Sequence, residues 1–302
     1  MSKVAVWVKT ARLRTLPLSV SGILVGSGLA LVEQQINWLL FGLCLFITIG
    51  FQVTSNFAND YGDGVKGTDG EDRVGPTRAI QSGALTPKEL LKGIYLSSAL
   101  SLALAIWLLW MSFGEDQLLL AVFFFILALI SIGGALKYTM GTNPYGYQGL
   151  GDLAVLLFFG LLAVWGTRFI LTQSWSAIEF LPAVAVGLLC TAVLNLNNLR
   201  DHISDEKHGK RTLVVKMGFS NGKRYHLSLL FVSLALFLLY LLVSQAAPKL
   251  YLTLWPYLIL ALHAKRVVAT DDPVKLDPEL KIVALSTFFL SLSFFLLNAL
   301  FS

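Results

Sequence analysis

The chain of 302 residues is 56% hydrophobic and only 14% charged, with a mean hydropathy of +0.71 and a formal net charge of +5. Soluble globular domains carry about 25% charged residues, so the composition excludes an ordinary soluble domain and predicts an integral membrane protein. We expect its partners to be the lipid bilayer and small substrates, and no nucleic acid; the sequence predicts no oligomeric state.

The chain begins with MSKVAVWVKTARLRTLP, which predicts a short basic amphipathic segment leading into the first membrane span. Apolar blocks of roughly 20 residues follow along the whole chain, the length that crosses about 30 Å of hydrocarbon. We therefore expect an all-α integral membrane protein with a single transmembrane domain and about nine transmembrane helices. The predicted spans are Leu16–Val32, Trp38–Phe57, Leu90–Trp110, Leu118–Tyr138, Leu150–Leu171, Phe180–Leu199, Tyr225–Ser244, Leu250–Val268 and Ile282–Leu300.

Lysine and arginine are concentrated on one side of the predicted membrane. The N-terminal segment and the connections after the second, fourth, sixth and eighth spans hold 21 of the 23 basic residues, which leaves Arg168 and Lys249 on the opposite side. The positive-inside rule makes the basic side cytoplasmic. This predicts a multi-pass protein of the cell (plasma or inner) membrane, with its N-terminus in the cytoplasm and its C-terminus outside.

Two similar polar stretches end the second and sixth predicted spans. The first, NFANDYGDGVKGTDGEDRVGPTRAIQSG, starts at Asn56, and the second, NLNNLRDHISDEKHGKRTLVVKMG, starts at Asn195. Aligning Asn59 with Asn197 gives a shared Asn-(Asp/Asn)-x-x-Asp pattern, with a further acid four residues on in the second stretch. The repetition predicts two weakly similar halves, at about 1–140 and 141–302.

The acids of these motifs lie where negative charge is unfavourable. Asp60 and Asp63 are three residues apart and Asp201 and Asp205 four apart, so each pair shares a helix face if its helix continues that far. A helix C-terminus disfavours negative charge, and ionisable groups near the membrane are costly. A bound cation explains their presence, and oxygen ligands suit Mg²⁺. The candidate metal ligands are Asn59, Asp60, Asp63, Asn198, Asp201 and Asp205.

Basic side chains follow each acidic motif. A diphosphate bridged by Mg²⁺ needs arginine or lysine on its remaining oxygens, which makes these residues candidate phosphate ligands. The alternative is that they are solvated loop charges that obey the positive-inside rule. The candidates are Lys66, Arg73, Arg78, Lys210 and Arg211.

The two motifs resemble the paired aspartate-rich motifs of the UbiA superfamily of intramembrane prenyltransferases, and the resemblance covers essentially the full chain. It implies a helical bundle with a central cavity that opens to the cytoplasmic side. Together with KYTMGTNPYGYQGLGDLAVLLFFG, which spans residues 137–160, the motifs look like the branch that prenylates 1,4-dihydroxy-2-naphthoate in menaquinone synthesis. One departure is Gly67, where the superfamily often has a third acid.

The resemblance implies a Mg²⁺-dependent reaction in which a polyprenyl group passes from polyprenyl diphosphate to 1,4-dihydroxy-2-naphthoate. Pyrophosphate and CO₂ are lost and a demethylmenaquinone forms. The implied catalytic residues are Asp60, Asp63, Asp201 and Asp205. The middle stretch supplies candidates that orient the aromatic acceptor or meet its carboxylate, although tyrosines there could instead anchor the protein at the membrane interface. These candidates are Arg12, Lys137, Tyr138, Tyr145, Tyr147 and Asp152.

Two alternatives remain open at this point. The acceptor could be another aromatic ring, such as 4-hydroxybenzoate or homogentisate, because such branches share the acidic motifs. The protein could also be a cation transporter, which would need acids deep within its spans. The sequence favours the first class, because none of the predicted spans carries an acid near its middle.

Overall fold

The polar residues that flank each apolar run determine where the helices begin and end. The computed structural model describes residues 2–33, 36–67 and 77–301, and in these ranges the regular structure is entirely helical. The helices are α1 Lys3–Thr10, η1 Leu13–Thr15, α2 Leu16–Glu33, α3 Trp38–Lys66, α4 Pro87–Phe113, α5 Leu118–Lys137, η2 Tyr145–Gln148, α6 Gly151–Val155, η3 Leu156–Gly166, α7 Thr167–Thr172, η4 Ala177–Glu179, α8 Phe180–Lys207, α9 Leu213–Met217, α10 Phe219–Val243, η5 Pro248–Leu254, α11 Pro256–Ala269, η6 Pro273–Leu276 and α12 Asp277–Phe301.

The ends of α3 and α4 show how local sequence sets these limits. Asn37 caps α3 by accepting hydrogen bonds from two backbone N–H groups of the first turn, and α3 ends at Gly67, whose φ of 70° is left-handed. α4 starts with Pro87 after a capping box formed by Thr86 and Glu89. These caps fix the residues at which α3 ends and α4 begins.

The prediction of a helical membrane protein is confirmed, with one difference in a predicted span. Eight helices in the described ranges are long and apolar enough to cross a membrane, and they correspond to eight of the nine predicted spans. The remaining span, Leu250–Val268, is divided into η5 and α11 on either side of Trp255. Pro256 has no N–H to donate to an earlier carbonyl, so one continuous helix is not formed there.

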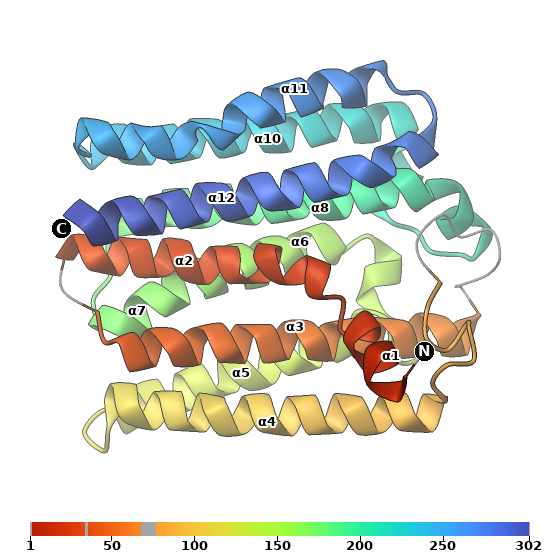
Figure 1. Cartoon of the computed structure of the whole chain (residues 1–302), viewed down its shortest axis with the longest axis horizontal. Coiled ribbons are helices and arrows are strands. Elements are labelled where there is room, and N and C mark those ends of the chain that lie inside the picture. The colour runs from red at the N-terminus through yellow and green to blue at the C-terminus, as the bar shows by residue number, and fades with distance from the viewer. Residues whose placement is uncertain (1, 34–35, 68–76, 302) are drawn as a thin grey trace.

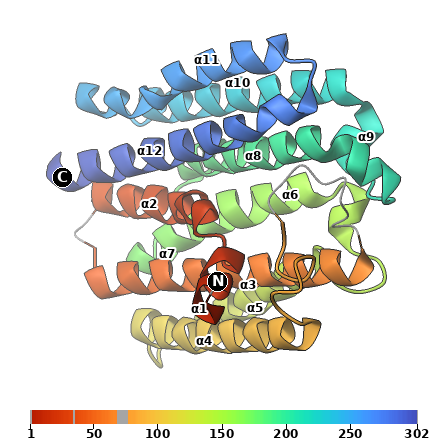
Figure 2. The ribbon, with the colours of Figure 1, turned by 45° about the vertical axis from the view of Figure 1, so that its right-hand side comes forward.

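The helices lie side by side along the long axis of the molecule (Figure 1). On one side α3 packs against α4 and α5, and on the other α8 packs against α10 and α12. Between these groups, α2 contacts both α12 and the central segment η3. Figure 2 shows the same order after rotation, with α1 crossing the front of the bundle near α3.

The centre of the bundle depends on close helix contacts at glycine. A Cβ atom added to Gly160 of η3 would lie 2.7 Å from the Cα of Gly187 in α8, so both helices need glycine to approach each other. The η3 segment is itself a π-helix, a wider coil than the predicted α-helix. Its divergence from a regular helix was not predicted from the sequence.

One end of the bundle carries the predicted functional segments. The N-terminal helix α1 and the end of α3 lie toward the right of Figure 1, and the C-terminus lies at the opposite end. Figure 2 shows the short helix α9 at the right as well, again opposite the C-terminus. We call this the motif end, defined by α1 and by residues 58–67, 77–86, 138–152 and 197–217. The placement of this end in the cytoplasm stays a prediction, as do the two similar halves of the chain.

Candidate active site

Both acidic motifs lie on long helices, as expected. α3 continues to Lys66 and α8 to Lys207, so Asp60, Asp63, Asp201 and Asp205 all sit in their last turns. Asp60 is 2% exposed and Asp63 is 5% exposed. The helix containing the first motif ends at Gly67 in a left-handed conformation, which explains why no third acid continues that helix face.

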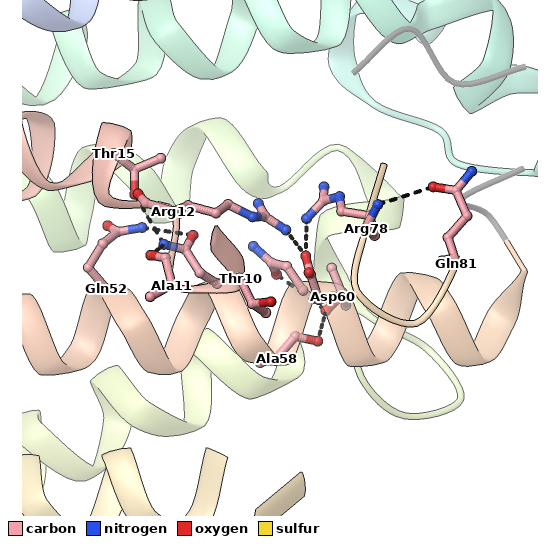
Figure 3. A network of polar contacts seen from close by, with 12 residues as sticks. Thr10, Ala11, Arg12, Thr15, Gln52, Ala58, Asp60, Arg78 and Gln81 are labelled. Atoms are coloured by element: carbon pink, nitrogen blue, oxygen red, sulfur yellow. Dashed lines mark hydrogen bonds and ion pairs between the residues drawn. The ribbon is translucent and has the colours of Figure 1, made fainter. Parts of the chain in front are cut away.

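Asp60 is the meeting point of two arginines from different parts of the chain. Its Oδ1 accepts hydrogen bonds from the guanidinium of Arg12, in the bend after α1, and from that of Arg78, in the segment before α4 (Figure 3). Arg78 was predicted to bind phosphate and Arg12 the acceptor carboxylate. The structure brings both to the first acid of the motif, where a buried carboxylate requires such partners.

Asp63 lies in a second group of polar residues, whose members all contact Tyr147. The Tyr147 hydroxyl donates to Asp63 Oδ1 at 2.8 Å. Lys66 Nζ lies 4.6 Å and Lys210 Nζ 5.2 Å from the centre of the Tyr147 ring, within the range of cation–π attraction. The backbone carbonyl of Tyr147 also accepts from the N–H of Arg211 at 2.9 Å. Tyr147 therefore links the first motif to the second.

Lys210 joins the acids of both motifs electrostatically. Its Nζ lies 3.8 Å from Asp205 Oδ1. Burial lowers the pKa of Lys210, but the carboxylates of Asp63 and Asp205 outweigh burial and raise the pKa above its ordinary value. One ammonium group thus lies in the combined field of carboxylates from α3 and α8, and it stays charged at neutral pH.

The donor set fits Mg²⁺ in its chemistry, although the four predicted acids do not form one closed cage. In the described part of the chain, no three carboxylate, imidazole or thiol groups lie close enough to share one ion. Mg²⁺ commonly takes one or two carboxylates and completes its shell with water and phosphate oxygens. Asp63 and Asp205, which already share the field around Lys210, suit that pattern.

Asp201 is held by a residue that was not among the predicted site residues. Arg200 donates from Nε to Asp201 Oδ1 at 2.8 Å and from a terminal nitrogen to Asp201 Oδ2 at 2.6 Å. A further nitrogen of Arg200 donates to Asp277 at the start of α12, also at 2.6 Å. Arg200 is only 5% exposed, so it fixes the orientation of Asp201 within the bundle.

Thr139 is a second residue that the sequence analysis missed. Its carbonyl accepts from Lys66 Nζ at 2.7 Å, and its hydroxyl donates to the carbonyl of Ala58 at 3.0 Å. This contact is possible because residue 62 is glycine: an added Cβ would lie 2.5 Å from Thr139 Oγ1. Gly62, which stands between Asp60 and Asp63, was the sign in the sequence that another segment of the chain packs closely against this helix.

An apolar cavity of about 330 Å³ lies beside α3. Asn59, Tyr138 and Tyr145 are among its polar lining residues, and the rest of its lining is largely aliphatic and phenylalanine side chains. The two tyrosine rings meet edge to face at 5.5 Å, and the Tyr145 hydroxyl donates to the carbonyl of Gly134 at 2.9 Å. Burial raises the pKa of Tyr145 to about 12. Asn59 lies at the boundary between this cavity and the acidic motif.

Four of the remaining predicted residues lie in the described chain, and one lies outside it. Lys137 and Arg211 have exposed side chains, and Asp152 is buried beside the Tyr225 hydroxyl. Asn198 is buried on α8, three residues before Asp201. Arg73 lies outside the described residues.

Known proteins resemble this chain over nearly its whole length. Residues 19–292 match the UbiA prenyltransferase family. A 1,4-dihydroxy-2-naphthoate octaprenyltransferase of Haemophilus influenzae is 42% identical over 97% of this chain and 95% of its own length. The Escherichia coli protein of the same name is 40% identical over 93% of this chain and 91% of its own.

A solved structure shares the fold at much lower sequence identity. The structure of a UbiA homologue from Archaeoglobus fulgidus bound to GPP and Mg²⁺ superposes with a TM-score of 0.67 at 16% identity. The superposition covers 97% of this chain and 100% of that one. The helical arrangement is therefore common to both proteins.

Proposed function

This chain belongs to the UbiA prenyltransferase family, and we propose that it transfers a polyprenyl group from polyprenyl diphosphate to 1,4-dihydroxy-2-naphthoate. The observation that carries the proposal is the position of Asn59, which lines the apolar cavity and directly precedes Asp60 of the motif. A lipid tail in the cavity would have its diphosphate beside the motif residues. The names of the relatives favour naphthoate over other rings, and family membership argues against a cation transporter.

The ion that we propose is Mg²⁺, in line with the bound state of the Archaeoglobus fulgidus structure. Asp63 and Asp205 are its proposed principal ligands, and Asn59, Asp60, Asn198 and Asp201 complete the set predicted from the sequence. When bound, the ion acts as a Lewis acid that neutralises charge on the departing pyrophosphate.

The basic residues of the motif end are proposed to bind the diphosphate. Lys66 and Lys210, held over the Tyr147 ring, are proposed to donate to phosphate oxygens, together with Arg78. Fixed donors aimed at developing negative charge typically contribute several kcal/mol each to catalysis. The high pKa of Lys210 supports this role, because the side chain keeps its proton at neutral pH.

The proposed reaction exchanges one bond for another at the first carbon of the prenyl chain. The carbon–oxygen bond breaks and pyrophosphate leaves with the electron pair. The electron-rich ring carbon that bears the carboxylate then bonds to the allylic cation. The carboxylate departs as CO₂, and the electrons of its bond restore the aromatic ring, which gives the quinol form of demethylmenaquinone. Apolar walls exclude water that would otherwise capture the cation.

The reaction is proposed to take place on the cytoplasmic side of the membrane. The chain is a multi-pass integral membrane protein by its helices and its family. The concentration of lysine and arginine at the motif end supports the cytoplasmic placement of that end.

The test is prenyl transfer by detergent-purified protein with octaprenyl diphosphate and carboxyl-labelled 1,4-dihydroxy-2-naphthoate. We expect labelled CO₂ and a prenylated naphthoquinone with Mg²⁺, and neither product with EDTA. Transfer to 4-hydroxybenzoate or homogentisate with none to the naphthoate would replace the proposed acceptor. A folded protein that prenylates no acceptor would contradict the proposal altogether.

A further inference from the structure

A buried cluster of ionisable side chains joins α10, α11 and α12, which are neighbouring helices in Figure 1. His226 of α10 and His263 of α11 are fully buried, and Glu279 of α12 is 7% exposed. The Nε2 atoms of the two histidines lie 2.8 Å apart, and Nδ1 of His263 lies 2.5 Å from Oε2 of Glu279. Arg266 of α11 donates to both oxygens of Glu279, at 2.6 and 3.1 Å. We call these four residues the histidine network.

The positions of the protons in the histidine network follow from its charges. The guanidinium of Arg266 offsets the carboxylate of Glu279, so the two imidazoles are uncharged. An ionised carboxylate only accepts, so His263 donates to Glu279 from Nδ1 and keeps a lone pair on Nε2. His226 then donates to that lone pair from its own Nε2. The network is therefore one hydrogen-bond chain that runs from α10 through α11 to α12.

The histidine network is separate from the apolar cavity, whose described lining includes none of its four residues. Ionisable groups within membrane-spanning helices are costly and are usually retained for function. A buried polar set adds little net stability compared with apolar residues of the same size, but a fully hydrogen-bonded set fixes a single geometry. The geometry that this network fixes is that of the first turn of α12, which contains Glu279.

The same turn of α12 carries a second acid, which reaches the proposed metal site. Asp277 lies two residues before Glu279, and its Oδ1 accepts from Arg200 at 2.6 Å. Arg200 in turn holds both oxygens of Asp201. The side chain of Asp277 is 45% exposed, so packing around it does not fix its position. Glu279 is buried and bonded to α11, so it fixes the turn from which Asp277 extends.

We propose that the histidine network is a positioning device for Asp201 of the second motif. By fixing the first turn of α12, the network presents Asp277 to Arg200, and Arg200 then orients the carboxylate of Asp201. The inference rests on the proposed function, in which Asp201 belongs to the site of Mg²⁺ and diphosphate. It extends that site to α10 and α11, which carry none of the residues predicted from the sequence. Groups that lie behind a metal ligand commonly set its orientation and the affinity for the ion.

The test compares variants that break the chain with one that preserves it. His226→Leu leaves Nε2 of His263 without a donor, whereas His226→Gln supplies an amide N–H in place of the imidazole N–H. We expect His226→Leu and Glu279→Gln to raise the Mg²⁺ concentration for half-maximal prenyl transfer about three- to tenfold, less than the effect of losing a group that contacts a metal ligand directly. His226→Gln should stay within about twofold of wild type, because its donor keeps the chain closed.

Thermal unfolding gives a second readout, which does not depend on turnover. Mg²⁺ with pyrophosphate should stabilise the detergent-purified protein, because a ligand of the folded state raises the unfolding temperature. The Mg²⁺ concentration that gives half of this stabilisation should rise in His226→Leu and Glu279→Gln by the same factor as in the kinetic assay. Each variant is compared with itself in EDTA, so a loss of intrinsic stability does not enter the comparison.

A double-mutant cycle tests the route through Asp277. Asp277→Ala and Glu279→Gln should each raise the half-saturating Mg²⁺ concentration. The double variant should be no worse than the larger single change, because both changes act on Asp201 through Arg200. Effects that multiply would show that Glu279 acts independently of Asp277, and would overturn the inference.

The control is Glu179→Gln, which weakens another buried ion pair at the other end of α8. Glu179 is 6% exposed and accepts from the fully buried Arg168 at 2.9 Å. Glu179→Gln should lower the unfolding temperature and leave both Mg²⁺ concentrations unchanged. The same pattern in Glu279→Gln and His226→Leu would make the histidine network purely structural and overturn the inference.

The two variants of His226 decide the matter if Glu279→Gln does not fold, because they keep the pair between Glu279 and Arg266. Equal Mg²⁺ requirements in His226→Leu and His226→Gln would then overturn the inference. A wild-type protein that Mg²⁺ with pyrophosphate does not stabilise, and that does not prenylate the naphthoate, would instead contradict the proposed function itself.

Discussion

The hydroxyl of Tyr147 donates a hydrogen bond of 2.8 Å to Asp63, although 84 residues separate the two in sequence. The same ring lies beneath Lys66 and Lys210. Tyr147 therefore orients a proposed metal ligand through its hydroxyl and two proposed phosphate ligands through its ring. We interpret it as a positioning residue for the diphosphate site, rather than the acceptor ligand predicted from sequence.

Replacing Tyr147 in two ways should separate these two tasks. Tyr147→Phe removes the hydrogen bond to Asp63 and keeps the ring, so the Mg²⁺ concentration for half-maximal rate should rise about tenfold. Tyr147→Ala also removes the ring, and the KM for octaprenyl diphosphate should then rise about two- to fivefold for each lysine released. Steady-state kinetics over a series of Mg²⁺ concentrations would measure both. The idea fails if the phenylalanine and alanine variants show the same pattern.

The close contact at Gly62 predicts a sharp effect from one methyl group. In Gly62→Ala the new Cβ would lie 2.5 Å from Thr139 Oγ1 and 2.7 Å from its carbonyl oxygen. The loop must move, and Lys66 loses the carbonyl that holds it. We expect prenyl transfer to fall at least about tenfold, with thermal unfolding in detergent shifted to lower temperature.

Gly42 supplies the matched control because it lies on the same helix. An added Cβ at Gly42 would have no neighbouring heavy atom within 4 Å. Gly42→Ala should therefore keep full activity, and it should stabilise the helix slightly, since alanine has the higher helix propensity. Equal losses of activity in the two variants would show that the Thr139 contact is unimportant.

The pairing of Arg200 with Asp201 predicts that lysine cannot replace arginine here. Lysine keeps the positive charge but cannot donate to both oxygens of Asp201 and to Asp277 together. Arg200→Lys should lower the unfolding temperature and raise the Mg²⁺ requirement of the reaction. The exposed Arg224 offers the control Arg224→Lys, for which no change is expected. Wild-type Mg²⁺ dependence in Arg200→Lys would leave Arg200 a purely structural role.

Much of this site could be predicted from sequence, because it depends on helix periodicity and on short motifs. The placement of Asp60 and Asp63 on one helix followed from their spacing, and the continuation of α3 to Lys66 confirms it. The partners across the bundle could not be predicted in this way. Which group meets Tyr147 depends on how residues 138–150 fold between α3 and α8, and no local pattern specifies that path.

The break at Pro256 and the role of Arg200 are different cases. A proline within an apolar run is a visible signal for the end of a helix, so the division of the predicted span Leu250–Val268 could have been predicted. Arg200 stands next to Asp201, but adjacent residues on a helix usually point in different directions. Its long side chain turns back to reach the carboxylate, which sequence spacing does not indicate.

One acid from each motif should prove necessary for turnover. Asp63→Asn and Asp201→Asn should each reduce turnover about hundredfold or more, because both carboxylates belong to the proposed charge-stabilising set. Asp63→Asn should in addition raise the Mg²⁺ concentration that gives the half-maximal rate, because Asp63 is a proposed principal ligand of the ion and shares the field around Lys210 with Asp205. Turnover measured with saturating octaprenyl diphosphate over a range of Mg²⁺ would show this. Lys223→Ala, whose ammonium contacts the 268–271 segment away from the motifs, is the control and should keep wild-type rates. Full activity in both aspartate variants would remove the basis for a metal-bridged diphosphate at these helices, because carboxylates from each motif would then be dispensable.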